Sequence, residues 1–144
     1  MKAGFAFVEG ATSDLAFVAQ AATLDALFAV ASEALLAATV EDPSSVAPSE
    51  RRTLSLAEPD LELLLLRFLN ELVWLRDAKG LLLRAESVRI TREEGEAQLE
   101  ATLVGEPLSR IRHALAADVK AATAHGLRIE GRPEGFEARV TLDV

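Results

Sequence analysis

The fold is decided by the stretch Asp60-Leu-Glu-Leu-Leu-Leu-Leu-Arg-Phe-Leu-Asn-Glu-Leu-Val-Trp-Leu-Arg-Asp-Ala-Lys-Gly80. Its apolar residues recur at spacings of three and four, which predicts a helix. Asp60 is a suitable N-cap, and Gly80 offers a left-handed stop at the other end. Apolar residues, Trp74 among them, cover most of the helix surface. We therefore expect this helix to be central, covered on more than one side, with Trp74 in the core.

A second helical pattern precedes the first one in the chain. Apolar residues at positions 24, 27, 28, 31, 35 and 38 form one stripe, and Thr23 is placed as its N-cap. Pro43 disfavours helical geometry in the residue before it, so the helix should end by positions 41–43. Residues 43–50 are then expected to form a loop.

The remaining sequence alternates between apolar and polar residues with period two, which is typical of strands. Two runs flank the turn at 93–96 and predict an antiparallel hairpin, 88–90 and 97–103. The runs 119–123, 127–129 and 136–142 predict two further strands around the turn 131–135, and shorter strands are expected at 4–8, 15–19 and 53–56. Gly105-Glu-Pro107 is expected to break the chain. The sum is an α+β fold, a single domain over residues 1–144, with two main helices packed on a mostly antiparallel or mixed sheet.

Composition narrows the classes of function. The chain has 144 residues, 50% of them hydrophobic, which suits one core. Its net charge of −8 repels nucleic-acid phosphates, so we expect no direct strong binding to RNA or DNA, although docking onto a basic partner stays open. The absence of cysteine excludes disulfides and thiolate chemistry. Neither a signal-peptide core nor a membrane-spanning run occurs, so we expect a cytoplasmic protein without membrane contact.

Carboxylates are the remaining candidates for chemistry. The only two histidines, His113 and His125, do not have metal-ligand spacing, and no nucleophile elbow or phosphate-binding glycine loop occurs. Asp14 lies in a turn of small polar residues, and Asp143 is followed by Val144 at the end of the sequence. Oxygen ligands of this kind suit a hard cation such as Ca²⁺ or Mg²⁺. Composition alone favours the interpretation that these residues are ordinary surface acids.

Four segments, in order from about residue 5 to residue 144, resemble the archease family. Asp118-Val-Lys-Ala-Ala-Thr-Ala-His-Gly126 is similar to the family's V-K-A-V-T-Y-H segment, and the helix beginning at Asp60 is similar to its central helix. Gly105-Glu-Pro107 with Arg112-His113 matches a G-E-P turn and an R-H pair. Val140-Thr-Leu-Asp-Val144 resembles the family's closing strand.

The resemblance implies a function and a site. Archeases are accessory proteins, not enzymes, of the RtcB-type RNA ligase. They promote its guanylylation and multiple turnover in tRNA splicing or RNA repair, and they reach RNA only through the ligase. Carried over to this sequence, the divalent-metal ligands are Asp14, Asp143 and Val144 through its terminal oxygens, with Ca²⁺ expected and Mg²⁺ or Mn²⁺ as alternatives. Lys120 matches a functional lysine of the family, in contact with phosphate or partner.

The sequence also departs from the family's D-H-T-A-D motif. Gly10 and Ala11 replace its first two residues, and Ala22 stands where an acidic residue is common ahead of the first helix. Glu9 is an auxiliary candidate, because its longer side chain could reach back toward the metal. His125 is a second auxiliary candidate. Its alternative interpretation is a histidine that packs in the fold or ends a strand.

Two alternative functions stay open, and the departures from the motif favour the first of them. The first is a divergent archease-fold protein-binding module with weakened or lost metal binding. The second is an independent metal-dependent hydrolase, which is disfavoured because no general base is visible. We expect His113, next to two arginines, to be a loop group or a partner contact.

Overall fold

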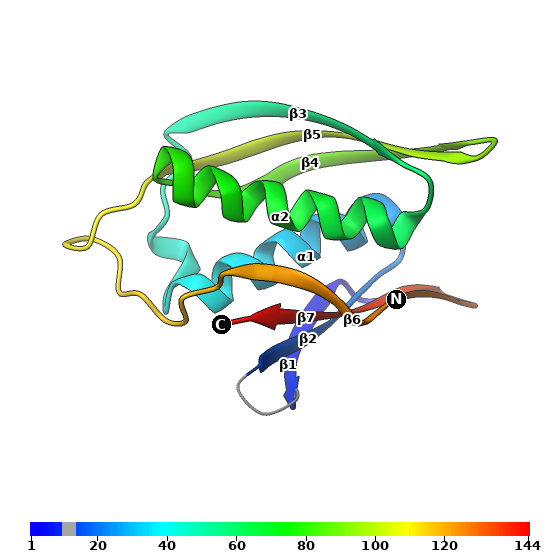
Figure 1. Ribbon diagram of the computed structural model, residues 1–144, viewed down its shortest axis with the longest axis horizontal. Coiled ribbons are helices and arrows are strands. Elements are labelled where there is room, and N and C mark those ends of the chain that lie inside the picture. The colour runs from blue at the N-terminus through cyan, green and yellow to red at the C-terminus, as the bar shows by residue number, and fades with distance from the viewer. Residues whose placement is uncertain (10–13) are drawn as a thin grey trace.

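Two helices lie between two antiparallel sheets in the computed structural model, which describes residues 1–9 and 14–144 (Figure 1). Gly10 and Ala11 lie outside the described residues. One sheet has the order β1-β2-β7-β6, with the bounds Gly4–Glu9, Asp14–Ala21, Gly135–Asp143 and Ala121–Arg132. The other has the order β3-β5-β4, with the bounds Glu50–Glu58, Glu96–Pro107 and Leu81–Glu93. The predicted α+β class is therefore confirmed, with two separate sheets in place of one.

The helices begin and end where their capping residues predict. Helix α1 spans Leu24–Thr39, and the Thr23 hydroxyl accepts a hydrogen bond from the backbone N–H of Ala26 at 3.1 Å. Helix α2 spans Leu61–Lys79, and the Asp60 carboxylate accepts from the N–H of Leu63 at 2.8 Å. Gly80 closes α2 in the left-handed region at φ +67°, a conformation that suits glycine. A short 3₁₀ turn, η1, occupies Pro43–Ser45 within the predicted loop.

The core fills the helical layer and the inner faces of both sheets. Phe28 of α1 and Phe68 of α2 are fully buried, and their ring centroids lie 6.1 Å apart. Phe17 and Leu142 contribute from the four-stranded sheet, and Leu99 contributes from the three-stranded sheet. Because the helices have sheet on two sides, both sheets present only one apolar face to the core and leave the other to solvent.

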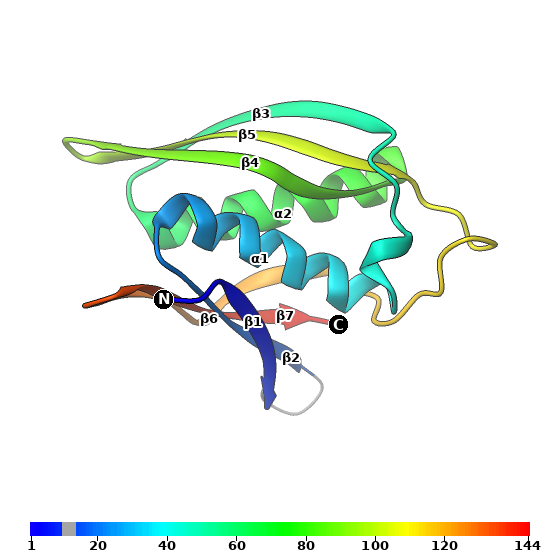
Figure 2. The same cartoon turned by 180° about the vertical axis from the view of Figure 1, so that it is seen from behind.

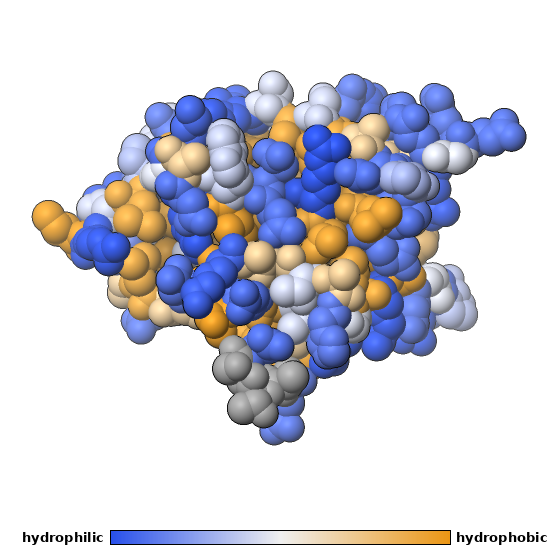
Figure 3. Space-filling model, in the orientation of Figure 1, coloured by the Kyte–Doolittle hydropathy of each residue, from blue (hydrophilic) through white to orange (hydrophobic). Residues whose placement is uncertain are grey.

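Helix α2 is covered by both sheets but is open on one flank. The two views show α1 and α2 side by side between the sheets (Figures 1 and 2). One flank of α2 lies beside α1, and the opposite flank faces away from it. Trp74 lies on the open flank with 52% of its surface exposed, so its predicted place in the core is wrong. The Lys79 ammonium lies 5.9 Å from the centroid of its ring. On this flank, hydrophilic residues lie between the areas of hydrophobic surface (Figure 3).

Several strands run longer than the sequence pattern indicates. Strand β5 continues to Pro107, so the break predicted at Gly105-Glu-Pro107 is wrong. Gly105 keeps the strand in the sheet because a Cβ there would collide with the carbonyl oxygen of Leu82 on β4. Strand β4 begins at Leu81, directly after α2, and β6 is one strand whose register shifts between Thr123 and Arg128. None of the described helices has the length and apolar character needed to cross a membrane.

Candidate functional site

Asp14 and Asp143 lie directly opposite each other in the pairing of β2 with β7. Residues opposite each other in an antiparallel pair direct their side chains to the same face, with Cβ atoms about 5 Å apart. The next pair inward, Leu15 with Leu142, faces the helices, and Leu142 is fully buried. Side chains alternate along a strand, so the two carboxylates share the face that points away from the helices. Asp14 is partly buried and Asp143 is exposed.

Lys120 and Val144 adjoin this acid pair. The backbone N–H of Lys120 donates to the carbonyl oxygen of Asp143 at 2.8 Å, and Ala121 is the strand partner of Asp143 on β6. The Lys120 side chain is exposed, whereas Val144 is partly buried and packs against the core. Three segments that are distant in sequence, those of Asp14, Lys120 and Asp143, therefore meet at one end of the four-stranded sheet (Figure 1).

The two auxiliary candidates do not complete the acid pair. Glu9 lies opposite Leu15, so its side chain leaves β1 on the face opposite that of Asp14. His125 is exposed in the irregular part of β6, where the register with β7 shifts. Within residues 1–9 and 14–144, no group of three or more His, Asp or Glu side chains is arranged to hold a metal ion.

The donor chemistry of the pair still suits a hard divalent cation. Ca²⁺ takes six to eight oxygen ligands and Mg²⁺ takes six, often including several waters. Asp14 and Asp143 supply two carboxylates on one face, and Val144 directly follows Asp143. The kind of donor therefore fits, while the described side chains leave most coordination positions to water, backbone carbonyls or a bound phosphate.

Ala22, the third departure from the family motif, is distant from the acid pair. It follows the far end of β2, eight residues beyond Asp14, which corresponds to roughly 25 Å along an extended strand. An acidic side chain at this position would not reach the cation that Asp14 would bind. The absence of an acid at Ala22 therefore concerns a part of the surface distant from the Asp14–Asp143 pair.

A second polar cluster, which was not predicted, consists of the buried Glu106 and His113 together with the exposed Arg112. The Glu106 carboxylate accepts from the backbone N–H of Ala47 at 2.8 Å, lies 2.9 Å from Nε2 of His113, and pairs with Arg112. The Ala47 N–H, followed by His113, lowers the pKa of Glu106 to about 2. The Ser109 N–H donates to Nδ1 of His113 at 2.9 Å, so Nε2 holds the proton that is shared with Glu106.

This cluster fixes the loop that follows β5. His113 is 2% exposed and Glu106 is 4% exposed. Of the two expected roles of His113, that of a loop group is confirmed and that of a partner contact is wrong. The reason is that His113 turns inward to satisfy the buried carboxylate, which would be costly to leave without partners. The signal in the sequence was the segment Gly105-Glu-Pro107 followed five residues later by the pair Arg112-His113.

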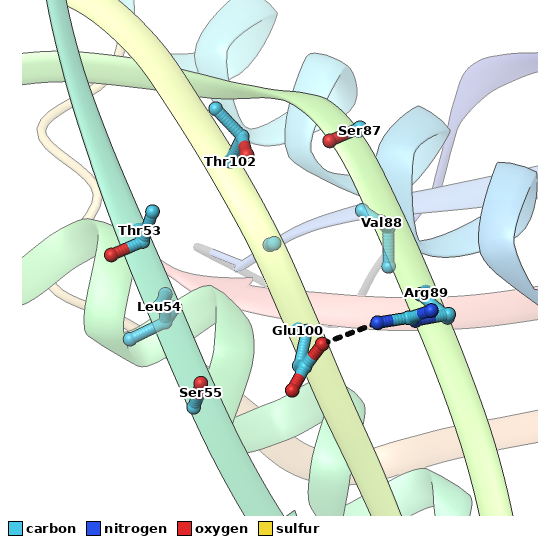
Figure 4. Close-up of a pocket in the computed structure, with 9 residues that line it drawn as sticks. Thr53, Leu54, Ser55, Ser87, Val88, Arg89, Glu100 and Thr102 are labelled. Atoms are coloured by element: carbon cyan, nitrogen blue, oxygen red, sulfur yellow. Dashed lines mark hydrogen bonds and ion pairs between the residues drawn. The ribbon is translucent and has the colours of Figure 1, made fainter.

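A hollow of about 450 Å³ lies on the outer face of the three-stranded sheet, the sheet that does not contain the acid pair. It is lined by hydroxyl side chains, among them Thr53, Ser55 and Ser87 (Figure 4). Its charged groups are Arg89 and Glu100, paired across the strands at 2.8 Å. Exposed pairs of this kind contribute little to stability, and no histidine or second acid lines the hollow. The acid pair is therefore the stronger candidate site.

Comparisons with known proteins agree on one family. The model of the Archease protein family (MTH1598/TM1083) matches residues 5–144. Protein archease of Thermococcus gammatolerans is 37% identical over 124 residues, which cover 86% of this chain and 87% of that protein. Protein archease of Methanosarcina acetivorans is 32% identical over 136 residues, with 92% and 91% covered.

Two solved structures are similar to the whole fold. The solution structure of protein 1598 of Methanobacterium thermoautotrophicum has a TM-score of 0.84 and 30% identity, covering 98% of this chain and 99% of that one. The crystal structure of an archease, described as a possible chaperone, from Thermotoga maritima has a TM-score of 0.63 and 21% identity, covering 95% and 94%. At that identity the second likeness concerns the fold alone.

Proposed function

Because the chain belongs to the archease family, we propose that it is an accessory protein that activates an RNA ligase of the RtcB type. In this role it promotes guanylylation and multiple turnover of the ligase during tRNA splicing or RNA repair in the cytoplasm. One observation on this chain supports the proposal in addition to its family membership. Asp14 and Asp143, two of the residues that the resemblance assigns to a metal site, are strand partners on one face of the sheet.

In the proposed site, Asp14, Asp143 and Val144 hold a divalent cation, with Ca²⁺ as the first candidate and Mg²⁺ or Mn²⁺ as alternatives. When bound, such a cation neutralises charge on the phosphates of GTP in the ligase. The two carboxylates orient the cation because β2 and β7 hold them side by side. Lys120, fixed to Asp143 through its backbone, directs an exposed ammonium group toward phosphate or partner.

Charge supports a protein partner that itself binds RNA. This chain carries a net charge of −8, so it is repelled by free RNA and attracted to the basic surface of an RNA-binding enzyme. RNA is therefore reached only through the ligase.

A ligation assay with the cognate ligase at limiting concentration tests the proposal. Wild-type protein should raise both the guanylylated fraction of the ligase and the number of turnovers, whereas Asp14→Asn and Asp143→Asn should lose most of the effect. Asp118→Asn is the matched control, because its side chain is 84% exposed and lies outside the acid pair. If wild-type protein leaves guanylylation and turnover unchanged, the proposed activation is refuted.

A second candidate function is an archease-fold protein-binding module with weakened or lost metal binding. It is favoured by the absence of a group of three ligating side chains in the described residues, and by Gly10 and Ala11 in place of the family's polar residues. Calorimetry with Ca²⁺, Mg²⁺ and Mn²⁺ on wild type and Asp143→Ala separates the candidates. Ligase binding that persists without measurable cation binding supports the module.

An independent metal-dependent hydrolase is the weakest candidate. It requires a general base and a fuller set of metal ligands, and no such group of His, Asp and Glu occurs in the part of the chain that the structure describes. Hydrolysis of nucleotides or RNA ends by the isolated protein would be needed to support it.

A further inference from the structure

Edge strands expose unpaired N–H and C=O groups, and most proteins protect them with charges or irregular register. Three of the four edge strands in the described part of the chain are protected in this way. Strand β6 has a register shift and carries the ion-paired Arg128 and Arg132. Strand β4 has a register shift after Ala85, and β3 begins with the charged run Glu50-Arg-Arg52.

Strand β1 is the unprotected edge. It pairs with β2 over all six residues, Gly4–Glu9, without a register shift. No charged residue occurs between Lys2 and Glu9. Phe5 and Phe7 are 37% and 41% exposed and lie edge-to-face with centroids 5.8 Å apart. Among the described elements, β1 contacts only β2 and α1, so its outer edge is open (Figure 2).

We propose that β1 pairs antiparallel with β1 of a second copy of this chain, which joins two four-stranded sheets into one continuous sheet. A two-fold axis perpendicular to the sheet keeps the helices of both copies on the same side. In that arrangement Ala6 lies on the axis, and Phe5 of each copy lies opposite Phe7 of the other. Cross-strand aromatic pairs of this kind stabilise antiparallel sheets.

The sequence of β1 complements itself in this register, which favours a second copy over an unrelated strand. Gly4 lies opposite Val8, and Ala6 lies opposite itself, so no two large side chains collide on the outer face. The Lys2 end of each strand lies beside the Glu9 end of the other, and this places opposite charges together. The Asp14–Asp143 pair belongs to β2 and β7, so this interface is separate from the proposed metal site.

Analytical ultracentrifugation over a wide concentration range tests the interface on the full chain. The wild-type mass should rise with concentration from 15.4 kDa toward twice that value. Ala6→Lys places two ammonium groups opposite each other at the axis and should weaken the dimer roughly tenfold or more, and Ala6→Glu should act in the same way. Ala6 is exposed in the single chain, so both variants should stay folded.

Mixing the two variants gives the sharpest readout. Ala6→Lys and Ala6→Glu, each monomeric alone, should form a mixed dimer because the opposed charges now attract. Ala57→Lys is the matched control, since Ala57 is an exposed alanine on another edge strand, β3, and this variant should dimerise like wild type. A wild-type chain that stays monomeric, an Ala6→Lys variant that dimerises unchanged, or a mixture that stays monomeric would overturn the proposal.

Discussion

Removing one charge of the acid pair should raise the stability of the folded protein in the absence of a cation and lower it in the presence of one. Asp14 and Asp143 are like charges directly opposite each other across two strands. Such a pair destabilises a sheet by about 0.5 kcal/mol when nothing lies between the carboxylates. Asp143→Asn keeps the shape of the side chain and removes this repulsion. In a metal-free solution the variant should therefore be more stable than wild type.

The size of each effect follows from the length of the chain. An unfolding entropy of about 2.1 cal/mol/K per residue gives about 0.3 kcal/mol/K for 144 residues. The relief of about 0.5 kcal/mol should then raise the Tm of metal-free Asp143→Asn by about 2 °C. A cation at about 100 times its Kd stabilises the folded state by about 2.7 kcal/mol, which raises the Tm of wild type by about 9 °C. The variant should lose most of that rise.

Differential scanning calorimetry in chelator and in a Ca²⁺ series measures both effects in the same experiment. Asp118→Asn is again the control, because it removes one negative charge without touching the acid pair. Its Ca²⁺-dependent rise in Tm should equal that of wild type. If Asp143→Asn lowers the metal-free Tm, repulsion between the two carboxylates does not destabilise the sheet. If Ca²⁺ raises the Tm of the variant and of wild type equally, the two carboxylates do not share a cation.

Three further predictions concern the fold. The pKa of Glu106 is lowered to about 2, so its contribution to stability is present above pH 4.5 and is lost as the pH falls from 4.5 toward 2; urea unfolding of Glu106→Gln should show a weaker dependence on pH in that window than wild type. Phe68→Ala leaves a cavity beside Phe28 and should lower the free energy of unfolding by about 3–5 kcal/mol, measured by the same method at neutral pH. Gly105→Ala should force β5 and β4 apart at the Leu82 carbonyl and lower the Tm more than Gly4→Ala, where the added Cβ meets nothing; equal Tm values for these two variants would contradict the close approach.

The helices were predictable from the sequence because their signals are local. Thr23, Asp60 and Gly80 act within one helical turn of themselves, and the structure confirms all three. Trp74 was misplaced because the helical pattern gives the width of the apolar surface but not the number of neighbours that cover it. The flank of α2 that carries Trp74 is open because α1 and the two sheets cover the other sides of the helix, and this arrangement is set by the tertiary structure.

The ends of the strands were harder to predict from the sequence, because local and tertiary signals conflict there. Gly105 and Pro107 favour a turn locally, yet pairing with β4 extends β5 through both residues. The burial of Glu106 and His113 could not be read from the sequence either, because a charged side chain is usually exposed unless specific partners satisfy it. Those partners, such as the N–H of Ala47, come from a loop 59 residues away.

The candidate site was reached from a resemblance and not from periodicity. Asp14 and Asp143 are 129 positions apart, 143 minus 14, and no local pattern links them. The pairing of β2 with β7 supplies the missing information, and it also separates Glu9 from Asp14 by placing the two on opposite faces. The metal itself stays a prediction.

Strand β7 lies inside its sheet, between β2 and β6, although it is the last element of the chain. During synthesis the β1–β2 hairpin and β6 emerge earlier but have no common neighbour until Gly135–Asp143 follows them. Contacts of such long sequence separation form slowly, and they form together with the closing of the sheet. A nascent or partly unfolded chain therefore cannot present the Asp14–Asp143 pair, so only a chain that has finished folding would be able to act on a partner through it.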